Sequence, residues 1–258
     1  MTAIEINVFG TPREITDDDL RGQSAVVIDV LRSSATITNA LQNGAREVIP
    51  VVSPAEAGEL ASRTGRGVSL LGGERDGKKI EGFDLSNSPS EYTFDRVNGR
   101  IIVFASTNGA PTLVRARAAE RVYLGGYNNY SALLQRLIDD ARPVVFLCSG
   151  KLEHFSIEDF VCAGMYAAGL AQQLGKRAAL SDSALAALSL YDRYSRDIVA
   201  LHNECSHGRF LAQLGWSSDL EFCARVDTHP IIPTFIEGKI KAFRLNGSPL
   251  IEVNTIPV

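Results

Sequence analysis

The sequence predicts an α/β protein with three layers, α/β/α, in which helices cover both faces of a largely parallel or mixed sheet. Apolar runs of strand length alternate with amphipathic stretches of helix length, and five or more strand-then-helix steps follow one another. Of the 258 residues, 45% are hydrophobic and 22% charged, which is enough for a substantial core. We expect a single domain over residues 1–258; the alternative is two subdomains that divide near 174–181.

The first half of the chain alternates apolar strands with helices that begin at a capping residue. Strands are predicted at Ser24–Val30, Glu47–Val51, Val68–Leu71 and Arg100–Ala105. Ser33 or Ser34 is expected to cap a helix that runs to Asn43, with Gly44 beyond its end. Ser53-Pro54 opens a second helix that Gly65 closes, and a third begins near Ala110.

The second half continues the same alternation and then changes character. Strands are predicted at Arg121–Leu124 and Val144–Cys148, and helices at Tyr130–Ala141, Ile157–Leu174 and within Ser183–His202. From Thr234 onward, the segments KIKAFRL and PLIEVNT have the pattern of short strands. Because Asn-Gly favours a tight turn, we expect them to pair as an antiparallel hairpin around Asn246-Gly247.

Composition restricts the partners and the location. A net charge of −4 and a pI near 5.6 exclude a generally basic nucleic-acid-binding surface. No charge-free apolar run approaches the roughly 18 residues of a membrane-spanning helix, and MTAIEINVFG does not resemble a signal peptide. Four scattered cysteines without a C-x-x-C motif are expected to be reduced thiols. We therefore expect a cytoplasmic protein that binds neither nucleic acid nor membrane.

Polar residues follow the first predicted strand at its carboxyl end, where open α/β sheets bind ligands. Asp29 ends the apolar run, and Arg32, Ser33 and Ser34 come directly after it. A buried carboxylate there needs a metal or a cation as partner. A guanidinium, two hydroxyls and free helix N–H groups suit a phosphate with a metal beside it. The alternative is an ordinary Asp29–Arg32 ion pair with a serine cap.

A polar stretch of about seventeen residues follows the strand Val68–Leu71, and we interpret it as one long loop. Loops of this length without regular structure are usually functional or disordered. A solvated loop with Asn and Ser turns is the alternative. The stretch supplies two carboxylates, one guanidinium and three short polar side chains: Glu74, Asp84, Arg75, Ser86, Asn87 and Ser88.

Two further strand ends carry groups that can bind an anion or a metal. Thr107, Asn108 and Gly109 follow RIIVFA and precede a helix, so their backbone N–H groups can form an anion-binding nest, or simply a capped turn. Ser149 and Gly150 follow the strand Val144–Cys148.

Two carboxylates open the long helix that comes next. Ser156 and Asp159 have the spacing of a capping box, so Asp159 has a structural interpretation as well as one as a metal ligand. Glu158 is not needed for the cap and is a candidate magnesium ligand.

Several catalytic motifs are absent from the sequence. There is no C-x5-R phosphatase signature, no G-x-S-x-G nucleophile elbow and no G-x-G-x-x-G dinucleotide loop. Among the histidines, His207 in Ser-His-Gly-Arg is the most interesting, although a single histidine is more often a structural residue than a catalyst.

Six segments in order resemble the 2-phosphosulfolactate phosphatase family (ComB-like). They are VVIDVLRSSATI, LLGGERDGKKIEGFDLSNSP, ASTNGAPTL, CSG with FSIEDFVCAG, SHGRFL, and DLEFCARVDTHPIIP. The resemblance implies an α/β/α fold and a magnesium-dependent phosphatase that converts 2-phospho-3-sulfolactate to 3-sulfolactate and phosphate, a step towards coenzyme M. It also implies an oligomer, for which we favour a dimer.

The resemblance and the residues together give a hypothesis for the site. Asp29, Arg32 and Glu158 are the expected catalytic residues. Ligands for Mg²⁺, and the base that activates water, would come from Asp29, Glu74, Asp84, Glu158 and Asp159. Residues that would contact the substrate are Ser33, Ser34, Arg75, Ser86, Asn87, Ser88, Thr107, Asn108, Gly109, Ser149 and Gly150.

Mechanism and function leave alternatives open. We favour a metal-activated water over a phosphoenzyme, for which Asp29 is the only plausible nucleophile. A magnesium-dependent hydrolase of another small acidic phosphoester would use the same pocket. A non-catalytic anion-binding protein would retain the helix N-termini without the chemistry.

Overall fold

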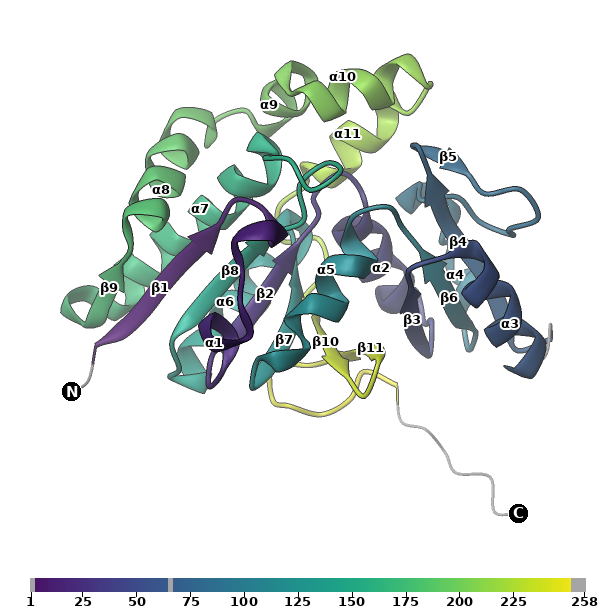
Figure 1. Ribbon diagram of the computed structural model, residues 1–258, viewed down its shortest axis with the longest axis horizontal. Helices are drawn as coiled ribbons and strands as arrows, with labels where there is room; N and C mark the ends of the chain where they lie inside the picture. The colour runs from purple at the N-terminus through teal and green to yellow at the C-terminus, as the bar shows by residue number, and fades with distance from the viewer. Residues whose placement is uncertain (1–2, 65–66, 252–258) are drawn as a thin grey trace.

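The computed structural model describes residues 3–64 and 67–251 and confirms the α/β prediction (Figure 1). The strands are β1 (Ile4–Phe9), β2 (Ser24–Ile28), β3 (Glu47–Val51), β4 (Ser69–Arg75), β5 (Lys78–Lys79), β6 (Ile101–Ala105), β7 (Arg121–Gly125), β8 (Val144–Cys148), β9 (Ala178–Leu180), β10 (Ile232–Ile236) and β11 (Lys239–Phe243). The α-helices are α1 (Asp17–Leu20), α2 (Ser33–Gln42), α3 (Pro54–Thr64), α4 (Phe94–Val97), α5 (Gly109–Arg115), α6 (Tyr130–Asp140), α7 (Ile157–Leu174), α8 (Asp182–Tyr194), α9 (Ile198–Glu204), α10 (Ser206–Gln213) and α11 (Ser217–Cys223). Short 3₁₀ helices are η1 (Pro12–Glu14), η2 (Pro89–Glu91), η3 (Ala116–Ala118), η4 (Tyr127–Asn129) and η5 (Gly175–Arg177).

One mixed sheet contains these strands in the order β5-β4-β6-β3-β11-β10-β7-β2-β8-β1-β9. Strands β4, β6 and β3 pair in parallel, and so do β7, β2, β8, β1 and β9. The antiparallel hairpin β10–β11 lies between the two groups and pairs with β7 on one side and β3 on the other. The hairpin therefore joins two parallel groups into a single sheet.

Strand β2 shows why helices are needed on both faces. Its five residues are all buried, and the four apolar ones alternate between two clusters. Val26 and Ile28 pack in the cluster that contains Leu133 of α6 and Tyr166 of α7, whereas Ala25 and Val27 pack in the cluster with Leu41 of α2 and Leu113 of α5. A strand buried on both faces reads as a continuous apolar run, which is the pattern that predicted it.

Several local predictions were wrong. The predicted loop after Val68–Leu71 is partly strand, because β4 continues through Arg75 and turns into β5. The hairpin of β10 and β11, which turns at Glu237-Gly238, was not predicted. The pairing expected around Asn246-Gly247 is present in its described part, where Phe243 bridges Pro249 and the N–H of Leu250 donates to the carbonyl of Ala242. Residues 252–255 of PLIEVNT lie outside the described residues, as does Gly65. Strand β1 was not predicted, and residues 178–180, near the proposed subdomain division, pair with it as β9.

The predicted helix caps also differ from those observed. Arg32 occupies the N-cap position of α2, so neither Ser33 nor Ser34 caps that helix. Ser156 is the N-cap of α7, but its side chain accepts no capping hydrogen bond, so the predicted capping box does not form. Ser34 and Asp159 instead accept hydrogen bonds from the backbone of other segments.

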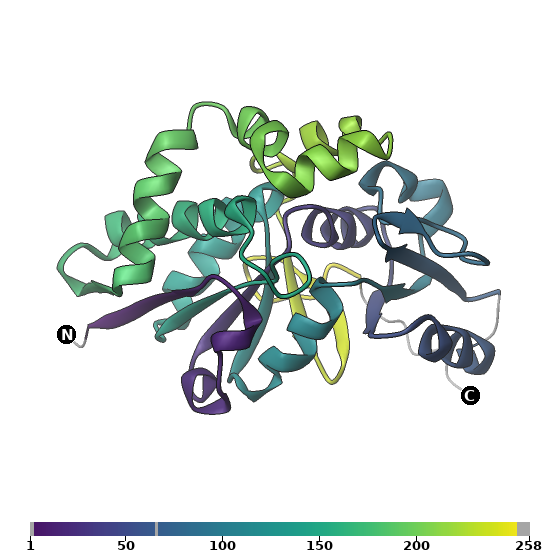
Figure 2. The ribbon, with the colours of Figure 1, turned by 45° about the horizontal axis from the view of Figure 1, so that its top comes forward.

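Helices α9, α10 and α11 lie across the carboxyl ends of the strands (Figure 2). Helix α10 packs beside the β4–β5 hairpin. A Cβ atom on Gly77 would lie 2.7 Å from Leu214 and 2.9 Å from Phe210, so the turn and the helix are in close contact. These helices therefore cover the edge at which the sequence placed ligand binding.

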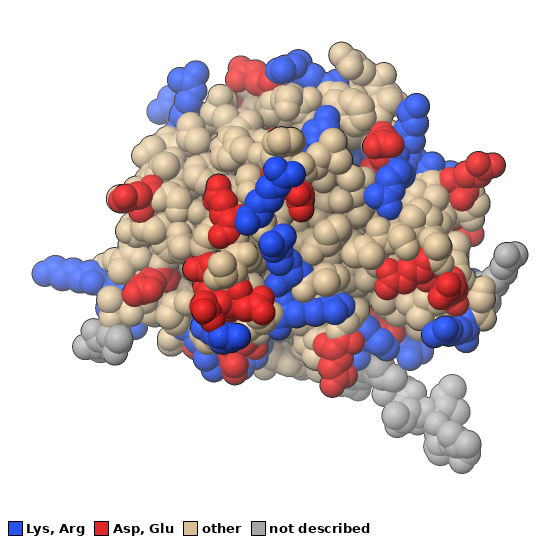
Figure 3. All heavy atoms as spheres, viewed as in Figure 1, with Lys and Arg blue, Asp and Glu red and all other residues tan. Residues whose placement is uncertain are grey.

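The surface carries mixed charge. On the face that Figure 3 presents, Lys and Arg side chains are interspersed with Asp and Glu. Within residues 3–64 and 67–251, no helix has the length and apolar character needed to cross a membrane. All four cysteines are buried and none forms a disulfide.

Candidate active site

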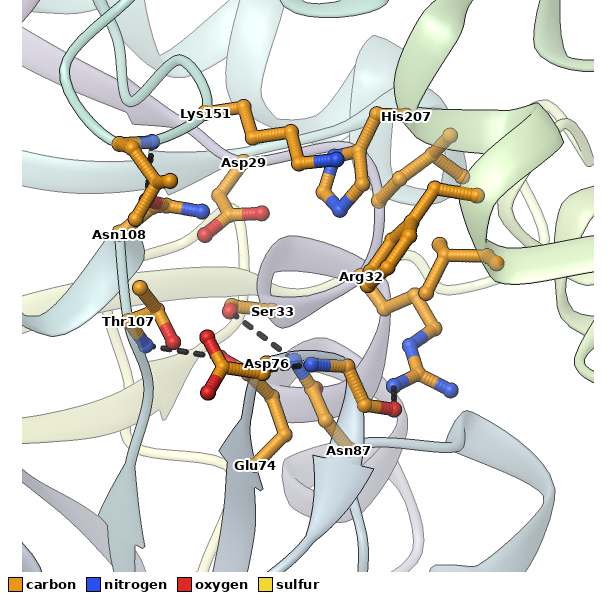
Figure 4. A pocket seen from close by; sticks show the side chains of 15 residues that line it. Asp29, Arg32, Ser33, Glu74, Asp76, Asn87, Thr107, Asn108, Lys151 and His207 are labelled. Carbon is orange, nitrogen blue, oxygen red and sulfur yellow. Dashed lines mark hydrogen bonds between the residues drawn. The ribbon is translucent and has the colours of Figure 1, made fainter. Parts of the chain in front are cut away.

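A cavity of about 290 Å³ lies where the carboxyl ends of β2, β4, β6 and β8 meet helix α10 (Figure 4). Its strand-side wall, the pocket floor, comes from the end of β4 and from segments beyond the strands, and consists of Asp29, Ser33, Glu74, Asn87, Thr107 and Asn108. The opposite wall, the pocket roof, consists of Lys151, Leu152, His207, Phe210 and Leu211. The remaining lining residues are Leu31, Arg32, Asp76 and Gly77.

Asp29 lies at the centre of the pocket floor and is 5% exposed. Burial raises the pKa of its carboxyl group to about 6; the charge of Glu74 adds to the rise, while His207 and a hydrogen bond from Ser33 oppose it. The adjoining helix begins very close to it, because a Cβ atom on Gly109 would lie 2.6 Å from Asp29 Oδ2. Glycine at 109 therefore leaves room for this carboxylate.

Glu74 is held by two backbone N–H groups. Thr107 donates to its Oε1 at 2.7 Å, and Gly77 donates to its Oε2 at 2.8 Å. These bonds tie the ends of β4 and β6 together and aim the carboxylate into the cavity. The preceding glycine is required, because Gly73 has φ +131° and a Cβ atom there would lie 1.9 Å from the carbonyl oxygen of Ala105.

Arg32 is buried at the edge of the pocket. Its Nη1 donates to Asp219 Oδ2 at 2.7 Å, its Nη2 donates to the carbonyl of Gly77 at 3.0 Å, and its guanidinium stacks 4.8 Å from the ring of Trp216. In Figure 4 the guanidinium points away from Asp29. The predicted Asp29–Arg32 ion pair is therefore not the one that forms, and Arg32 instead fastens α11 to the β4–β5 turn. The Leu31–Arg32 peptide bond is cis.

Two polar residues of the pocket roof complement the acidic floor. The Nζ of Lys151 lies 3.9 Å from the centre of the Phe210 ring, and no described carboxylate lies within ion-pairing distance of it. His207 turns its ring into the cavity, and its Nδ1 lies 3.3 Å from Glu158 Oε1 (Figure 4). Although burial opposes it, this contact lowers the pKa of Glu158, so Glu158 is a carboxylate at neutral pH.

Asp159 is used within the fold. Its Oδ1 accepts a hydrogen bond from the N–H of Val30 at 2.8 Å, and its Oδ2 accepts one from Gly150 at 3.0 Å. Burial, together with the charges of Glu158 and Asp29, raises its pKa well above the usual range. Asp159 thus joins the ends of β2 and β8 behind the pocket, and it does not line the cavity.

The other expected site residues are distributed around the pocket. Ser34 Oγ accepts the N–H of Asp29, a lining residue, at 2.9 Å. Ser88 Oγ donates at 2.7 Å to Asp219, the ion-pair partner of Arg32. Ser149 lines a neighbouring cavity that shares Thr107, Asn108 and Leu152 with the first.

Three of the expected residues are engaged elsewhere. Asp84 is exposed and accepts the N–H of Leu71 at 2.8 Å. Ser86 bonds to Glu91, and Arg75 donates to the carbonyl of Val52. The structure brings none of these three to the cavity.

Sequence reasoning missed Lys151, Asp76, Phe210 and Asp219. Lys151 follows directly after Gly150 at a strand end, so the rule that selected Ser149 and Gly150 would have found it one residue later. Phe210 and Asp219 stand in SHGRFL and DLEFCARVDTHPIIP, two of the segments that carry the resemblance, but only the packing of α10 and α11 onto the sheet gives them their positions.

The pocket floor suits a divalent cation that is bound partly by substrate. In the described ranges, no three or more His, Cys, Asp or Glu side chains are grouped as a metal cage. Asp29 and Glu74 are two carboxylates that line the same cavity. Mg²⁺ is commonly held by one or two carboxylates, several waters and substrate phosphate oxygens, so this donor set fits it.

Comparison with known proteins agrees with the resemblance. The model of the 2-phosphosulpholactate phosphatase family matches residues 9–238. A probable 2-phosphosulfolactate phosphatase of Symbiobacterium thermophilum is 42% identical over 226 residues, which cover 86% of this chain and 95% of that protein. Another, of Caldanaerobacter subterraneus subsp. tengcongensis, is 38% identical over 236 residues, with 92% and 97% covered. The chain therefore belongs to the 2-phosphosulfolactate phosphatase family and is a phosphoric monoester hydrolase.

Proposed function

We propose that the protein hydrolyses 2-phospho-3-sulfolactate to 3-sulfolactate and phosphate with the help of Mg²⁺, as in a step towards coenzyme M. The observation that carries this proposal is the juxtaposition, in one pocket, of two metal-competent carboxylates and an ammonium group free of ion pairs. Asp29 and Glu74 supply the carboxylates, and Lys151 supplies the ammonium. The names of the family and of the relatives supply the substrate.

The charge of this substrate matches the charges around the cavity. Carboxylate, sulfonate and phosphate groups together carry roughly four negative charges near neutral pH. Asp29 and Glu74 alone would repel such a molecule, so a divalent cation between them and the phosphate is needed. Lys151 lies on the opposite wall, where its ammonium can pair with the sulfonate or carboxylate. The pocket thus offers separate places for the two anionic ends of the molecule.

The residues of the pocket floor orient the reacting group. Mg²⁺, when bound at Asp29 and Glu74, would neutralise the phosphoryl oxygens and acidify a bound water. Asn87 Nδ2 lies 3.4 Å from Ser33 Oγ, so these two side chains can hydrogen-bond the phosphate from one side. Asn108 can do so from the other side. Asp29 lines the cavity beside the expected position of the phosphate and can accept the proton of the attacking water. Positioning and charge neutralisation of this kind account for most of phosphoryl-transfer catalysis.

Phosphate release from a substrate panel tests the proposal. We expect Mg²⁺-dependent turnover of 2-phosphosulfolactate, with a lower kcat/KM for 2-phospholactate and 3-phosphoglycerate, which lack the sulfonate. EDTA should abolish the activity and added Mg²⁺ should restore it. Preference for another panel member would favour a different small phosphoester as substrate. Binding without any phosphate release would favour a non-catalytic anion-binding protein.

Two further expectations accompany this function. We propose that the protein is cytoplasmic, in agreement with its reduced cysteines, and that it forms a homodimer. Light scattering during size-exclusion chromatography tests the second point. A mass near twice 27.9 kDa is the expected result, and a mass near 27.9 kDa would contradict it.

A further inference from the structure

His207 occupies a position that the packing of α10 determines closely. It is the second residue of the helix, and Cys205 Sγ accepts the N–H of Gly208 at 3.2 Å at the helix start. A Cβ atom on Gly208 would lie 1.6 Å from the carbonyl oxygen of His202, so the backbone on either side of His207 is tightly packed. The His207 side chain is 12% exposed. Its ring therefore has little freedom to leave the cavity.

Glu158 fixes the orientation of that ring. It is 2% exposed, lies at the start of α7, and places Oε1 3.3 Å from Nδ1 of His207. A carboxylate beside Nδ1 accepts the N–H of that nitrogen and so sets the tautomer and the orientation of the ring. Nε2 has no hydrogen-bond partner among the described residues and is free to face the ligand. This pairing of a buried carboxylate with a histidine is typical of an oriented acid–base catalyst.

Hydrolysis of an alkyl phosphate needs such a group. The leaving oxygen of 2-phosphosulfolactate belongs to a secondary alcohol, and an alkoxide of that kind leaves poorly unless it is protonated. Asp29 and Glu74 lie on the pocket floor, where phosphate and cation are expected. His207 lies on the side of the cavity opposite Glu74, with its ring turned towards Asp29 (Figure 4). In the proposed reaction, this position places the imidazole beside the ester oxygen.

We propose that His207 is the general acid of the reaction and that Glu158 is the residue that positions it, an inference that rests on the proposed function. The oxygen of water makes the new bond to phosphorus, and the proton of that water passes to Asp29. If a phosphoenzyme forms, Asp29 makes this bond instead, and water then hydrolyses the aspartyl phosphate to release phosphate and regenerate the carboxylate. The bond between phosphorus and the ester oxygen breaks, and its electron pair stays on that oxygen. The oxygen takes the proton from Nε2 of His207, so sulfolactate leaves as a neutral alcohol at C2. Solvent returns a proton to Nε2 before the next turnover.

This proposal gives Glu158 a different task from the one its sequence position indicated. The Oε1 atom faces His207, and Glu158 does not line the cavity. It therefore acts through the imidazole and touches neither the phosphate nor a metal. Glu158→Gln should weaken catalysis less than loss of His207 does, because the amide oxygen still orients the ring but the negative charge is gone.

A change of leaving group tests the assignment without relying on the pH profile. The two substrates are 2-phosphosulfolactate and its bridging phosphorothiolate analogue, in which sulfur replaces the ester oxygen. A thiolate leaves readily without a proton. For His207→Gln we expect kcat on the oxygen ester to fall about 100-fold or more, as general acid catalysis implies. On the sulfur ester, we expect kcat to fall less than about 5-fold, and KM to change little on either substrate.

Controls separate this test from failure of folding or of the proposed function. His154→Gln changes an exposed histidine outside the cavity and should behave as the wild type on both esters. His207→Ala provides a second variant, and thermal melting checks that each variant folds. An equal loss of kcat on both esters, or no loss on the oxygen ester, would overturn the assignment. If the wild type does not hydrolyse the oxygen ester, the proposed function fails first, and that result is distinguishable from the others.

Discussion

The floor and the roof of the pocket come from different kinds of structure. The pocket floor is built from the end of β4, from the segments that follow β2 and β6, and from the loop that carries Asn87. Strands β2 and β6 belong to the two parallel groups that the β10–β11 hairpin separates, so the floor gathers the carboxyl ends of both groups. The pocket roof comes from the loop after β8 and from α10, which reaches the site only by packing across the strand ends. The floor supplies carboxylates, hydroxyls and amides, and the roof supplies an ammonium and an imidazole. Under the proposed function, the floor would hold the phosphate and the roof the rest of the substrate.

The largest effect is expected from the pocket floor. Asp29→Asn removes the central carboxylate and should lower kcat at least 100-fold, because the amide can neither accept the proton of water nor bind Mg²⁺ well. Steady-state phosphate release measures this effect. Activity within a few-fold of the wild type would remove Asp29 from the site.

The same variant should be more stable than the wild type at neutral pH without metal. The pKa of Asp29 is about 6 when folded and 3.8 in the reference state, so folding raises it. Such a group disfavours folding progressively as pH rises from about 4 to 6, by up to about 3 kcal/mol. Urea denaturation in EDTA should therefore show little difference between the two proteins near pH 4 and a clear gain for the variant at pH 7. A loss of stability at pH 7 would contradict this account of the buried charge.

Glu74 and Asp84 were both expected to bind Mg²⁺, but only Glu74 lines the cavity, so comparing them tests the site that the structure shows. Glu74→Gln should lower kcat about 30-fold and raise the Mg²⁺ concentration needed for half-maximal activity, because one carboxylate oxygen becomes an NH₂ group beside the N–H donors that now bind it. Asp84→Asn lies outside the cavity and should change neither value more than about 2-fold. Magnesium titrations of both variants measure this, and the reverse ranking would support the sequence interpretation.

Arg32 tests whether the edge of the pocket is structural. Arg32→Lys keeps the charge but loses one of the two hydrogen bonds that the guanidinium makes to Asp219 and Gly77. We therefore expect the free energy of unfolding to fall by about 2 kcal/mol and Tm by roughly 5 °C. Arg75→Lys is the control, because Arg75 makes one long hydrogen bond to Val52 and should leave Tm nearly unchanged. An unaltered Tm for Arg32→Lys, with much reduced activity, would show instead that Arg32 contacts the phosphate.

The smallest effect should come from the pocket roof. Lys151→Ala removes the ammonium expected to pair with sulfonate or carboxylate, and should raise KM for 2-phosphosulfolactate about 10-fold while kcat changes less than about 3-fold. Its effect on 2-phospholactate, which lacks the sulfonate, distinguishes the two anions. If kcat falls as much as it does for Asp29→Asn, Lys151 acts on the phosphoryl group, and the division between floor and roof is wrong.

Much of the fold could be predicted because buried parallel strands leave a direct signal. The runs SAVVIDV and RIIVFA are apolar on both faces and became β2 and β6. The β4–β5 hairpin was missed because Gly72 and Gly73 usually weaken strands. Here they are needed, since a Cβ atom would collide with Tyr92 at the first position and with Ala105 at the second.

The site was predictable only in part, because some of its residues are placed by tertiary contacts. Asp29, Asn87 and Asn108 lie beside strand ends, and the rule that ligands bind there selected them. The same rule also selected Asp84, whose carboxylate instead binds the N–H of Leu71. His207 was noticed only as an interesting histidine, because its contact with Glu158 joins α10 to α7 and is a tertiary contact that no local pattern records.

A crystal structure with Mg²⁺ and 3-sulfolactate would test the central claim most directly. The account predicts a metal ion about 2.1 Å from oxygens of both Asp29 and Glu74, as Mg²⁺ geometry requires. It also predicts an anionic group of the product at Lys151 and the C2 hydroxyl within hydrogen-bonding distance of His207. A metal bound at Asp84 or Asp159, or a product seated beside Ser149 in the neighbouring cavity, would contradict it.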